Sequence, residues 1–290
     1  MAARQNSYCH AQWLQSIRSL RKYNQWISVH LMSYGDLPPI VVDEAARCSV
    51  KVHRLGSYEA YLAQVHKRAT ALAKYPTLHK FLSLSHIPDE VKHVLYLDCD
   101  TFFFADVAEV FTRYTQYEFY AREEVRSRRS QISYDSSYFD EDSFARTVAA
   151  LGLSSIGPFN SGVVLWNSQS WACVNSLRHQ FLDYCWRLMV GRQLVDIPRP
   201  DYEMPIRRAV LPLMDFADWE RAIPFPSSNP WILEEVALWM TLGRTSLRQG
   251  YFDSESVSQS GEWASPTPRR VLSHYFGAQE IPFFSQFSRI

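Results

Sequence analysis

The sequence has no excess of charge of either sign. Its 290 residues carry 30 Lys and Arg against 30 Asp and Glu, so the formal net charge is zero. No overall field would hold such a chain on nucleic acid or on an anionic membrane surface, although local patches stay possible. We therefore expect no nucleic-acid partner.

Paired cysteines are also absent. An odd number of widely spaced cysteines, with no C-x-x-C pair, argues against both a disulfide framework and a zinc site. A reducing cytoplasm is the simplest setting, and we expect a cytoplasmic protein. The five residues are Cys9, Cys48, Cys99, Cys173 and Cys185.

Long apolar runs are missing as well. The amino-terminal residues contain no run suited to a signal peptide, and no stretch approaches the ~20 apolar residues that a membrane-spanning helix requires. We therefore expect no membrane span, while association with a membrane surface stays open. There is also no internal repeat and no low-complexity segment.

What the sequence does have is enough apolar material for a large core, with 47% hydrophobic and 14% aromatic residues. Helical spacing over Tyr8–Tyr23 is followed by an alternating strand pattern over Trp26–Met32. A β-branched run over Val50–Leu55 is followed by a helical pattern over Tyr58–Lys74. Because strands alternating with helices favour parallel pairing, the sequence predicts an α/β fold with a mostly parallel central sheet flanked by helices.

The same alternation continues along the chain. A helical pattern over Thr77–His86 precedes His93–Leu97, an apolar run suited to a strand buried on both faces. Two stretches lack periodicity: a polar loop over Val125–Ser143 and a proline-rich, irregular segment over Asp196–Pro230. The remaining expected elements are a helix from Asp106, a strand near Glu118–Arg122, a strand over Ser161–Trp166, and helices over Trp171–Val190 and Glu234–Leu242.

The apolar run that ends at Leu97 is followed by Asp98-Cys99-Asp100. Ligands of open α/β sheets collect at the carboxyl ends of strands, and two carboxylates so close together repel each other unless a cation lies between them. Hard oxygen ligands suit magnesium or manganese, and such an ion can neutralise a departing diphosphate. The alternative is that both aspartates are polar residues where a strand meets water, one of them capping a helix.

A different reaction class also fits this segment. Leu95–Thr101 matches the first motif of haloacid-dehalogenase-like phosphatases, in which Asp98 would be the phosphorylated nucleophile and Asp100 the general acid. That motif usually ends the first strand of its fold, whereas here a long α/β pattern precedes it. Only Asp215 and Asp218 could correspond to the later acidic motif of these phosphatases, and the proline-rich sequence around them fits that motif poorly.

Several separate motifs resemble the glycogenin-like, family 8-type retaining glycosyltransferases of the GT-A fold, in the nucleotide-diphospho-sugar transferase superfamily. Tyr96–Thr101 resembles the YLDxDT motif of this family, and Phe159–Val163 resembles its FN(S/A)GV strand. His274–Gly277 resembles its HxxG element, and Ser16–Arg21 is similar to its first helix. The resemblance therefore spans nearly the whole chain.

This resemblance implies a single GT-A-like domain over residues 1–290. Residues 1–123 would form the nucleotide-binding half, ending with the DxD strand, and residues 124–290 the half for the acceptor and the donor sugar. The implied reaction moves a hexose from a nucleotide diphosphate, with uridine as the expected base, to an acceptor hydroxyl with retention. The acceptor could be a glycan, a lipid or a protein.

The resemblance also implies the site residues. Asp98, Asp100 and His274 would bind Mn²⁺ or Mg²⁺, and an imidazole ligand is better tolerated by manganese. Asp98, Asp100 and Glu234 are assigned to catalysis, with no nucleophile assigned. The residues assigned to donor binding are Lys80, Asn160, Ser161, Gly162, Glu235 and Gly277.

Each of these assignments has a structural alternative. Lys80 could be a solvated helix lysine, and His274 an ordinary surface or core histidine. Asn160 and Ser161 could serve only the entry to a strand. Acids at the start of a helix, such as Glu234-Glu235, favour the helix dipole, and Gly277 could be a turn residue.

The sequence departs from the family pattern in two places. After HxxG the family has a lysine that binds the diphosphate, whereas Ala278–Phe283 contains no cation; Arg126, Arg128 or Arg129 could replace it or form a solvated loop. The first strand of the family should precede the helix near Tyr8, but Met1–Ser7 has no strand pattern. A nucleotide- or sugar-binding relic without turnover is therefore an alternative function.

Overall fold

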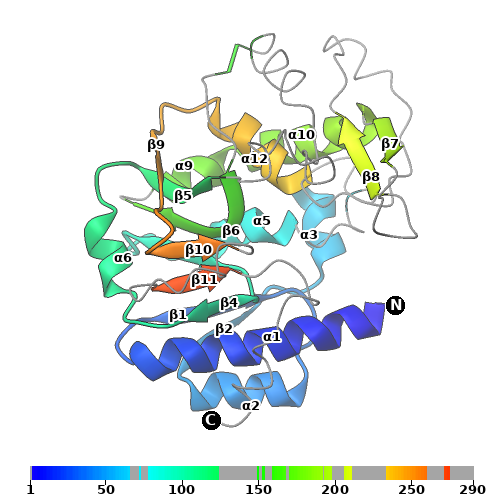
Figure 1. Ribbon diagram of the computed structural model, residues 1–290. Helices are drawn as coiled ribbons and strands as arrows, with labels where there is room; N and C mark the ends of the chain where they lie inside the picture. Colours follow the sequence, from blue (N-terminus) through cyan, green and yellow to red (C-terminus); the bar gives the residue numbers. More distant parts are fainter. Residues whose placement is uncertain are drawn as a thin grey trace.

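The computed structural model describes residues 2–65, 72, 78–123, 149, 152–153, 159–167, 170–191, 193–197, 206–210, 233–259 and 271–274. Its principal helices and strands alternate along the chain (Figure 1). They are α1 (Ala2–Tyr23), β1 (Val29–Ser33), α2 (Pro39–Arg47), β2 (Val50–Arg54), α3 (Tyr58–Val65), α5 (His79–Leu82), the 3-10 helix η2 (Ser83–His86), β3 (Val94–Leu97), β4 (Thr101–Phe103), α6 (Ala108–Arg113), β5 (Phe119–Glu123), β6 (Phe159–Trp166), α9 (Ser170–Ser176), α10 (Arg178–Gly191), β7 (Gln193–Ile197), β8 (Ile206–Val210), α12 (Leu233–Leu242), β9 (Gln249–Tyr251), β10 (Val257–Gln259) and β11 (Leu272–His274).

The α/β class is confirmed, and several boundaries are corrected. The expected helix over Trp171–Val190 is two helices, α9 and α10. A helix that the sequence did not predict, α2, begins at Pro39, where the fixed backbone of proline suits the first helical turn. The stretch expected to be irregular contains β8, which pairs with β7. The polar loop over 125–143 lies outside the described residues.

The expectation of a mostly parallel central sheet is wrong for the described strands. The four-stranded sheet has the order β3-β6-β5-β9, and β6 runs antiparallel to both β3 and β5. Only β5 and β9 pair in parallel within it. The hydrophobic pattern could not predict this, because a strand buried on both faces has the same pattern in either direction.

The parallel pair β1 and β2 forms a sheet of its own, separate from β3. No described strand pairs with both β1 and β3. The residues of β3 are only partly buried, as are the first four of β1.

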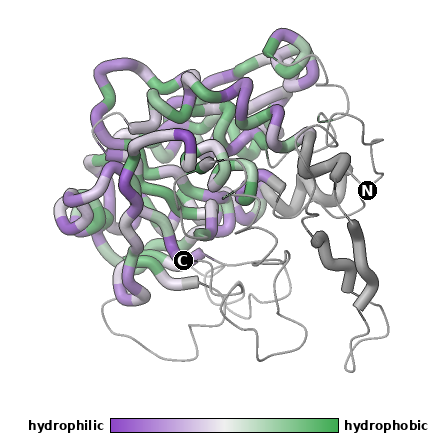
Figure 2. Tube along the Cα trace, turned by 90° about the horizontal axis from the view of Figure 1, so that it is seen from above, coloured by the Kyte–Doolittle hydropathy of each residue, from purple (hydrophilic) through white to green (hydrophobic). Residues whose placement is uncertain are grey.

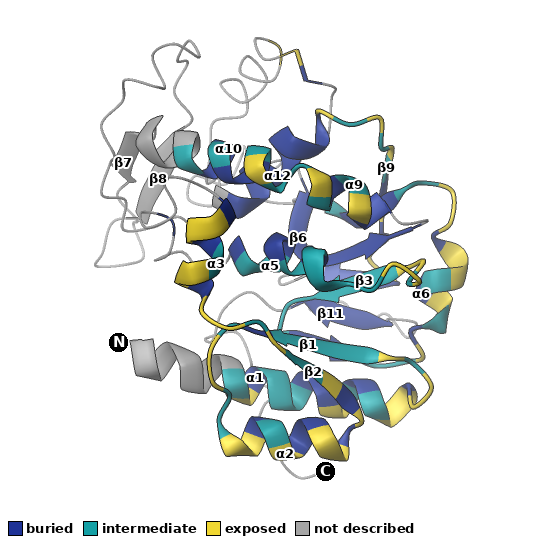
Figure 3. Cartoon of the chain, turned by 180° about the vertical axis from the view of Figure 1, so that it is seen from behind, coloured by how far each residue is buried: buried dark blue, intermediate teal, exposed yellow. Residues whose placement is uncertain are grey.

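Helices cover two opposite sides of the strands. In Figure 1, α1 and α2 lie below β1, β2 and β4, and α9, α10 and α12 lie above β5 and β6. Figure 2 shows apolar segments inside the molecule, and Figure 3 shows β6 buried and β3 of intermediate burial, while α2 has exposed residues on its outer face. The sheet therefore has a hydrophobic core on each of its faces.

Strand β6 divides these two cores. All eight of its residues are buried. Val164 and Trp166 belong to the core that includes α10 and α12, whereas Val163 and Leu165 belong to the core beneath, with α1. Because alternate side chains of a strand point to opposite faces, the apolar run of β6 supplies both cores.

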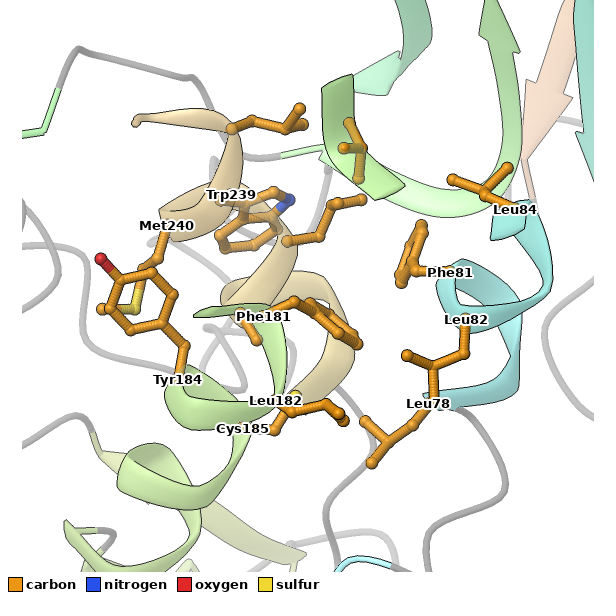
Figure 4. Packing of buried hydrophobic residues seen from close by; sticks show 14 of the residues in the cluster. Leu78, Phe81, Leu82, Leu84, Phe181, Leu182, Tyr184, Cys185, Trp239 and Met240 are labelled. Atoms are coloured by element: carbon orange, nitrogen blue, oxygen red, sulfur yellow. The ribbon is translucent and has the colours of Figure 1, made fainter. Parts of the chain in front are cut away.

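The core that includes α10 and α12, called the upper core below, packs α5 against these two helices (Figure 4). Phe81 of α5 meets Phe181 of α10 edge to face, with ring centroids 5.4 Å apart. Trp239 of α12 is buried and donates from Nε1 to the carbonyl oxygen of Phe159 at 3.0 Å. These contacts fix α5 against α10, and α12 against the start of β6, where site residues lie. Among the described residues, no helix is long and apolar enough to cross a membrane.

Candidate metal and donor site

The centre of the site is the turn between β3 and β4. Asp98 and Asp100 are separated by one residue, and one carboxylate oxygen of each lies within 4.8 Å of the other. Cys99 points the other way, and its Sγ lies 3.7 Å from Gln12 Oε1 of α1. The turn therefore gathers both carboxylates on the side away from α1.

Strand register brings the third ligand candidate to the same place. β11 pairs antiparallel with β4, and His274 lies opposite Thr101, the residue after Asp100. The His274 side chain is 4% exposed, and its Nε2 lies 3.2 Å from Asp100 Oδ1 and 3.7 Å from Asp98 Oδ2. A histidine far along the chain is thus delivered to the two aspartates by one short strand pair.

The three residues meet the requirements of a cation site. Each offers one ligand atom, and these atoms all lie within 4.8 Å of one another. Asp100 Oδ1 is buried and makes no well-formed hydrogen bond within the described part of the chain. Two carboxylates and one imidazole form a donor set that a divalent transition metal accepts.

Lys80 of α5 also lies at this site. Its Nζ donates to Asp98 Oδ2 at 2.7 Å and to Ser161 Oγ at 3.4 Å, and Glu234 Oε1 is 3.5 Å away. The side chains of Lys80 and Asp98 are mostly buried, at 16% and 18% exposure. Lys80 therefore joins the Asp98 turn to the first turn of α12.

Mutual attraction shifts the titration of these groups. Burial alone would lower the pKa of His274, but the Asp100 and Asp98 carboxylates outweigh it and raise that pKa to about 9. Burial likewise opposes the charge on Lys80, and the neighbouring carboxylates raise its pKa. Burial would raise the pKa of Asp98, but Lys80 and His274 lower it. Without a metal ion, all three groups are therefore charged at neutral pH.

Tyr96 contributes a contact that the sequence reasoning missed. Its hydroxyl donates to Asp98 Oδ1 at 2.7 Å, so both carboxylate oxygens of Asp98 have a donor. Burial raises the pKa of this phenol, which keeps it protonated as a donor. The signal was present in the sequence, because Tyr96 stands two residues before Asp98 and alternate strand residues share a face.

The start of β6 lies beside the aspartates. Asn160 and Ser161 are buried, and both donate to Glu235 of α12: Asn160 Nδ2 at 3.0 Å and Ser161 Oγ at 3.0 Å. The backbone of β6 also changes register here, because Ala121 lies opposite Val164 while Arg122 lies opposite Asn160. Such an irregularity beside a site redirects side chains, and here it brings Asn160 and Ser161 to α12.

The structure brings together all the residues assigned to the site from the sequence except one. Gly277 lies outside the described residues, as do Arg126, Arg128 and Arg129, Asp215 and Asp218, and the segment Ala278–Phe283. The residues that meet in one cluster come from both halves of the chain: Lys80, Asp98, Asp100, Asn160, Ser161, Gly162, Glu234, Glu235 and His274.

Acidic groups outnumber basic ones in this cluster. The carboxylates of Asp98, Asp100, Glu234 and Glu235 lie around Lys80 and His274, the two basic residues of the cluster. Buried charge of one sign is costly unless a counter-charge offsets it. The arrangement can therefore hold a divalent cation, and through it an anionic group such as a phosphate.

Comparisons with known proteins agree with this geometry. A galactosyltransferase, LgtC, in complex with donor and acceptor sugar analogues matches at 13% identity and a TM-score of 0.50, over 98% of this chain and 91% of that one. An active-site mutant of LgtC matches at 13% identity and a TM-score of 0.53 over the same shares. The bifunctional glycosyltransferase WbbM matches at 11% identity and a TM-score of 0.53, over 94% of this chain and 45% of that one. At these identities the likeness establishes the GT-A fold.

No curated protein matches the sequence. The model of one protein family does: glycosyl transferase family 8 matches residues 6–183, which is more than half of the chain. The match includes Lys80, the Asp98-Cys99-Asp100 turn and the start of β6, so it assigns this turn to a glycosyltransferase and not to a phosphatase. The chain belongs to glycosyl transferase family 8.

Proposed function

We propose that this glycosyltransferase moves a hexose from a uridine diphosphate sugar to an acceptor hydroxyl, with retention of configuration. The observation that carries the proposal is the convergence of Asp98, Asp100 and His274 within 4.8 Å of one another, beside the ammonium group of Lys80. A diphosphate is the anionic group for which such a cation site is suited. Family membership supports the sugar transfer.

Asp98, Asp100 and His274 would hold the divalent ion, with Mn²⁺ favoured over Mg²⁺ because of the imidazole. When bound, the ion supplies Lewis-acid stabilisation of the charge on the departing nucleotide diphosphate. Lys80 adds a second positive charge on the same side and is already held by Asp98 at 2.7 Å. Tyr96 and Lys80 together fix the orientation of the Asp98 carboxylate.

Glu234 is the acidic residue that we assign to catalysis at the sugar. Its carboxylate lies 3.5 Å from Lys80 Nζ and is 2% exposed, so a donor sugar held near Lys80 would meet it in a poorly solvated setting. In the donor-binding region we include Lys80, Asn160, Ser161, Gly162, Glu235 and, from the HxxG motif, Gly277. We further propose that residues 1–123 serve the nucleotide and residues 124–290 the donor sugar and acceptor.

The acceptor is a glycan, a lipid or a protein, and we propose that the enzyme acts in the cytoplasm. This location is supported by the cysteines: Cys48, Cys99, Cys173 and Cys185 are all free thiols. A reducing compartment keeps such residues in that state.

The proposal is tested by titrating the protein with uridine diphosphate in the presence and absence of Mn²⁺. We expect binding that requires Mn²⁺ and that is lost in Asp100→Ala, together with slow hydrolysis of at least one uridine diphosphate hexose from a panel, which releases uridine diphosphate and free hexose. Asp106→Ala is the matched control, because Asp106 is exposed and only caps α6 through the Ala108 amide. Absence of binding, or binding unchanged in Asp100→Ala, contradicts the proposal.

The same experiment separates the alternative of a binding protein without turnover. That alternative predicts metal-dependent binding of uridine diphosphate but no hydrolysis or transfer with any sugar of the panel. The observation that favours it is the separation of the β1–β2 pair from β3. Measurable release of free hexose that depends on Glu234 rejects it.

A further inference from the structure

One oxygen of Glu235 accepts three hydrogen bonds. Glu235 Oε1 lies 3.0 Å from Asn160 Nδ2, 2.9 Å from the Ser161 backbone nitrogen and 3.0 Å from Ser161 Oγ. All three residues are at least nine-tenths buried, with Glu235 5%, Asn160 4% and Ser161 0% exposed. A carboxylate oxygen with three buried donors is engaged within the protein and ties α12 to the start of β6.

The connection continues from Asn160 to the metal ligands. Asn160 Oδ1 accepts from the Gly162 amide at 2.9 Å, and the Gly162 carbonyl accepts from the Asp98 amide at 2.7 Å. The Cα atom of Gly162 faces the imidazole of His274, so closely that a methyl group there would overlap the ring. Gly162 therefore contacts two of the three ligand residues: it accepts a backbone hydrogen bond from Asp98 and packs against the ring of His274.

We propose that Glu235 is a positioning residue for the metal centre, holding Asn160 and Ser161 so that Gly162 supports Asp98 and His274. This inference rests on the proposed function and refines it. The amide of Asn160 and the hydroxyl of Ser161, which we include in the donor-binding region, both donate to Glu235. In this role Glu235 affects catalysis through the metal ligands that Gly162 supports.

Two substitutions of Glu235 separate these roles. Glutamine keeps an acceptor oxygen of the same shape, so Glu235→Gln preserves the three hydrogen bonds while removing the charge. Glu235→Ala removes the acceptor and leaves buried donors without a partner. Loss of a group that orients a metal ligand typically costs about 10- to 100-fold in metal affinity. We expect a loss of that size in Glu235→Ala and less than about threefold in Glu235→Gln, measured with Mn²⁺ alone by calorimetry.

Glu44→Ala is the matched control, because it also removes a buried carboxylate with several hydrogen bonds, but on α2, where its partners are Arg18 and Arg47. It should lower the melting temperature without changing Mn²⁺ affinity. If Glu235→Ala does not fold, Asn160→Asp decides the question. It places a second carboxylate against Glu235 and should weaken Mn²⁺ binding, and adding Glu235→Gln should restore much of the affinity by exchanging amide and carboxylate.

Wild-type Mn²⁺ affinity in Glu235→Ala overturns the proposal, as does an equal loss in Glu235→Gln and Glu235→Ala, which would assign the effect to charge. Absence of Mn²⁺ binding in the wild type overturns it as well. The proposed function fails separately: a protein that binds Mn²⁺ with the expected order of variants, but neither binds nor hydrolyses a uridine diphosphate sugar, keeps the positioning role and loses the transferase assignment.

Discussion

Gly162 of β6 lies directly against the imidazole of His274. A Cβ atom built on Gly162 would stand 2.0 Å from His274 Cε1 and 2.3 Å from Nε2, inside any possible contact distance. Because Gly162 of the FNSG motif has no side chain, the ring of His274 of the HYFG motif can occupy the position that a Cβ atom would otherwise take. Two motifs that lie far apart in the sequence thus form one packing unit at the proposed metal site.

Gly162→Ala should displace His274 and weaken Mn²⁺ binding by about tenfold or more, in the range seen when a ligand loses its support. Metal titration by calorimetry measures this effect. Gly250→Ala is the matched control, since its Cβ would stand 2.3 Å from Tyr120 Cε1 in β5, so it is equally crowded but meets no metal ligand. It should lower thermal stability and leave Mn²⁺ affinity unchanged; equal metal affinities in both variants would refute the prediction.

Mn²⁺ affinity should rise with pH up to about 9. The pKa of His274 is raised to about 9, so at neutral pH the metal-free protein holds a proton on the ring that the ion must displace. Below that pKa, each pH unit should lower the affinity by about tenfold.

Calorimetry at pH 7 in two buffers of different ionisation enthalpy gives the number of protons released. We expect about one proton per bound ion. Affinity that does not change between pH 6.5 and pH 8 would show that His274 is already neutral.

The buried carboxylate of Glu44 should make the fold sensitive to acid. Hydrogen bonds from Arg47 and Arg18 lower the pKa of Glu44 to about 2. The resulting stability is complete above the unfolded pKa of about 4.5 and is lost as the pH falls toward 2. Because both arginines are well exposed, we expect about 1–2 kcal/mol and not the full value of the shift.

Urea unfolding at pH 6 and pH 3 measures this contribution. The stability difference between wild type and Glu44→Gln should be present at pH 6 and shrink markedly at pH 3. Glu109→Gln is a suitable comparison, because Glu109 is exposed and its ion pair is long, with Oε1 3.9 Å from Arg113 Nη1. Its difference from wild type should stay near zero at both pH values.

Phe181→Ala should destabilise the protein by about 3–5 kcal/mol, because it empties a fully packed position in the upper core. Phe181 is 1% exposed and lies against Phe81, the neighbour of Lys80 on α5 (Figure 4). Chemical denaturation measures the loss. Phe111→Ala, at a partly buried position of α6 that packs against the other core, should cost clearly less; a similar loss for both would contradict the prediction.

The sequence by itself determined the α/β class and the position of the strand before Asp98, although β3 is only partly buried and not buried on both faces as expected. It could do so because period-2 and period-3.6 patterns are local, and because two carboxylates after an apolar strand are visible without any fold. The motif resemblance also singled out His274. The partner of Asp98 on its own strand, Tyr96, was equally visible and was missed.

Only the tertiary structure decided which way β6 runs and what its polar residues do. A doubly buried strand has the same composition in both directions, so the antiparallel pairing with β3 and β5 had no local signal. Register is likewise a relation between distant segments, and it is register that sets His274 opposite Thr101. The engagement of Asn160 and Ser161 with Glu235 follows from α12 packing on β6, a contact that no spacing in the sequence encodes.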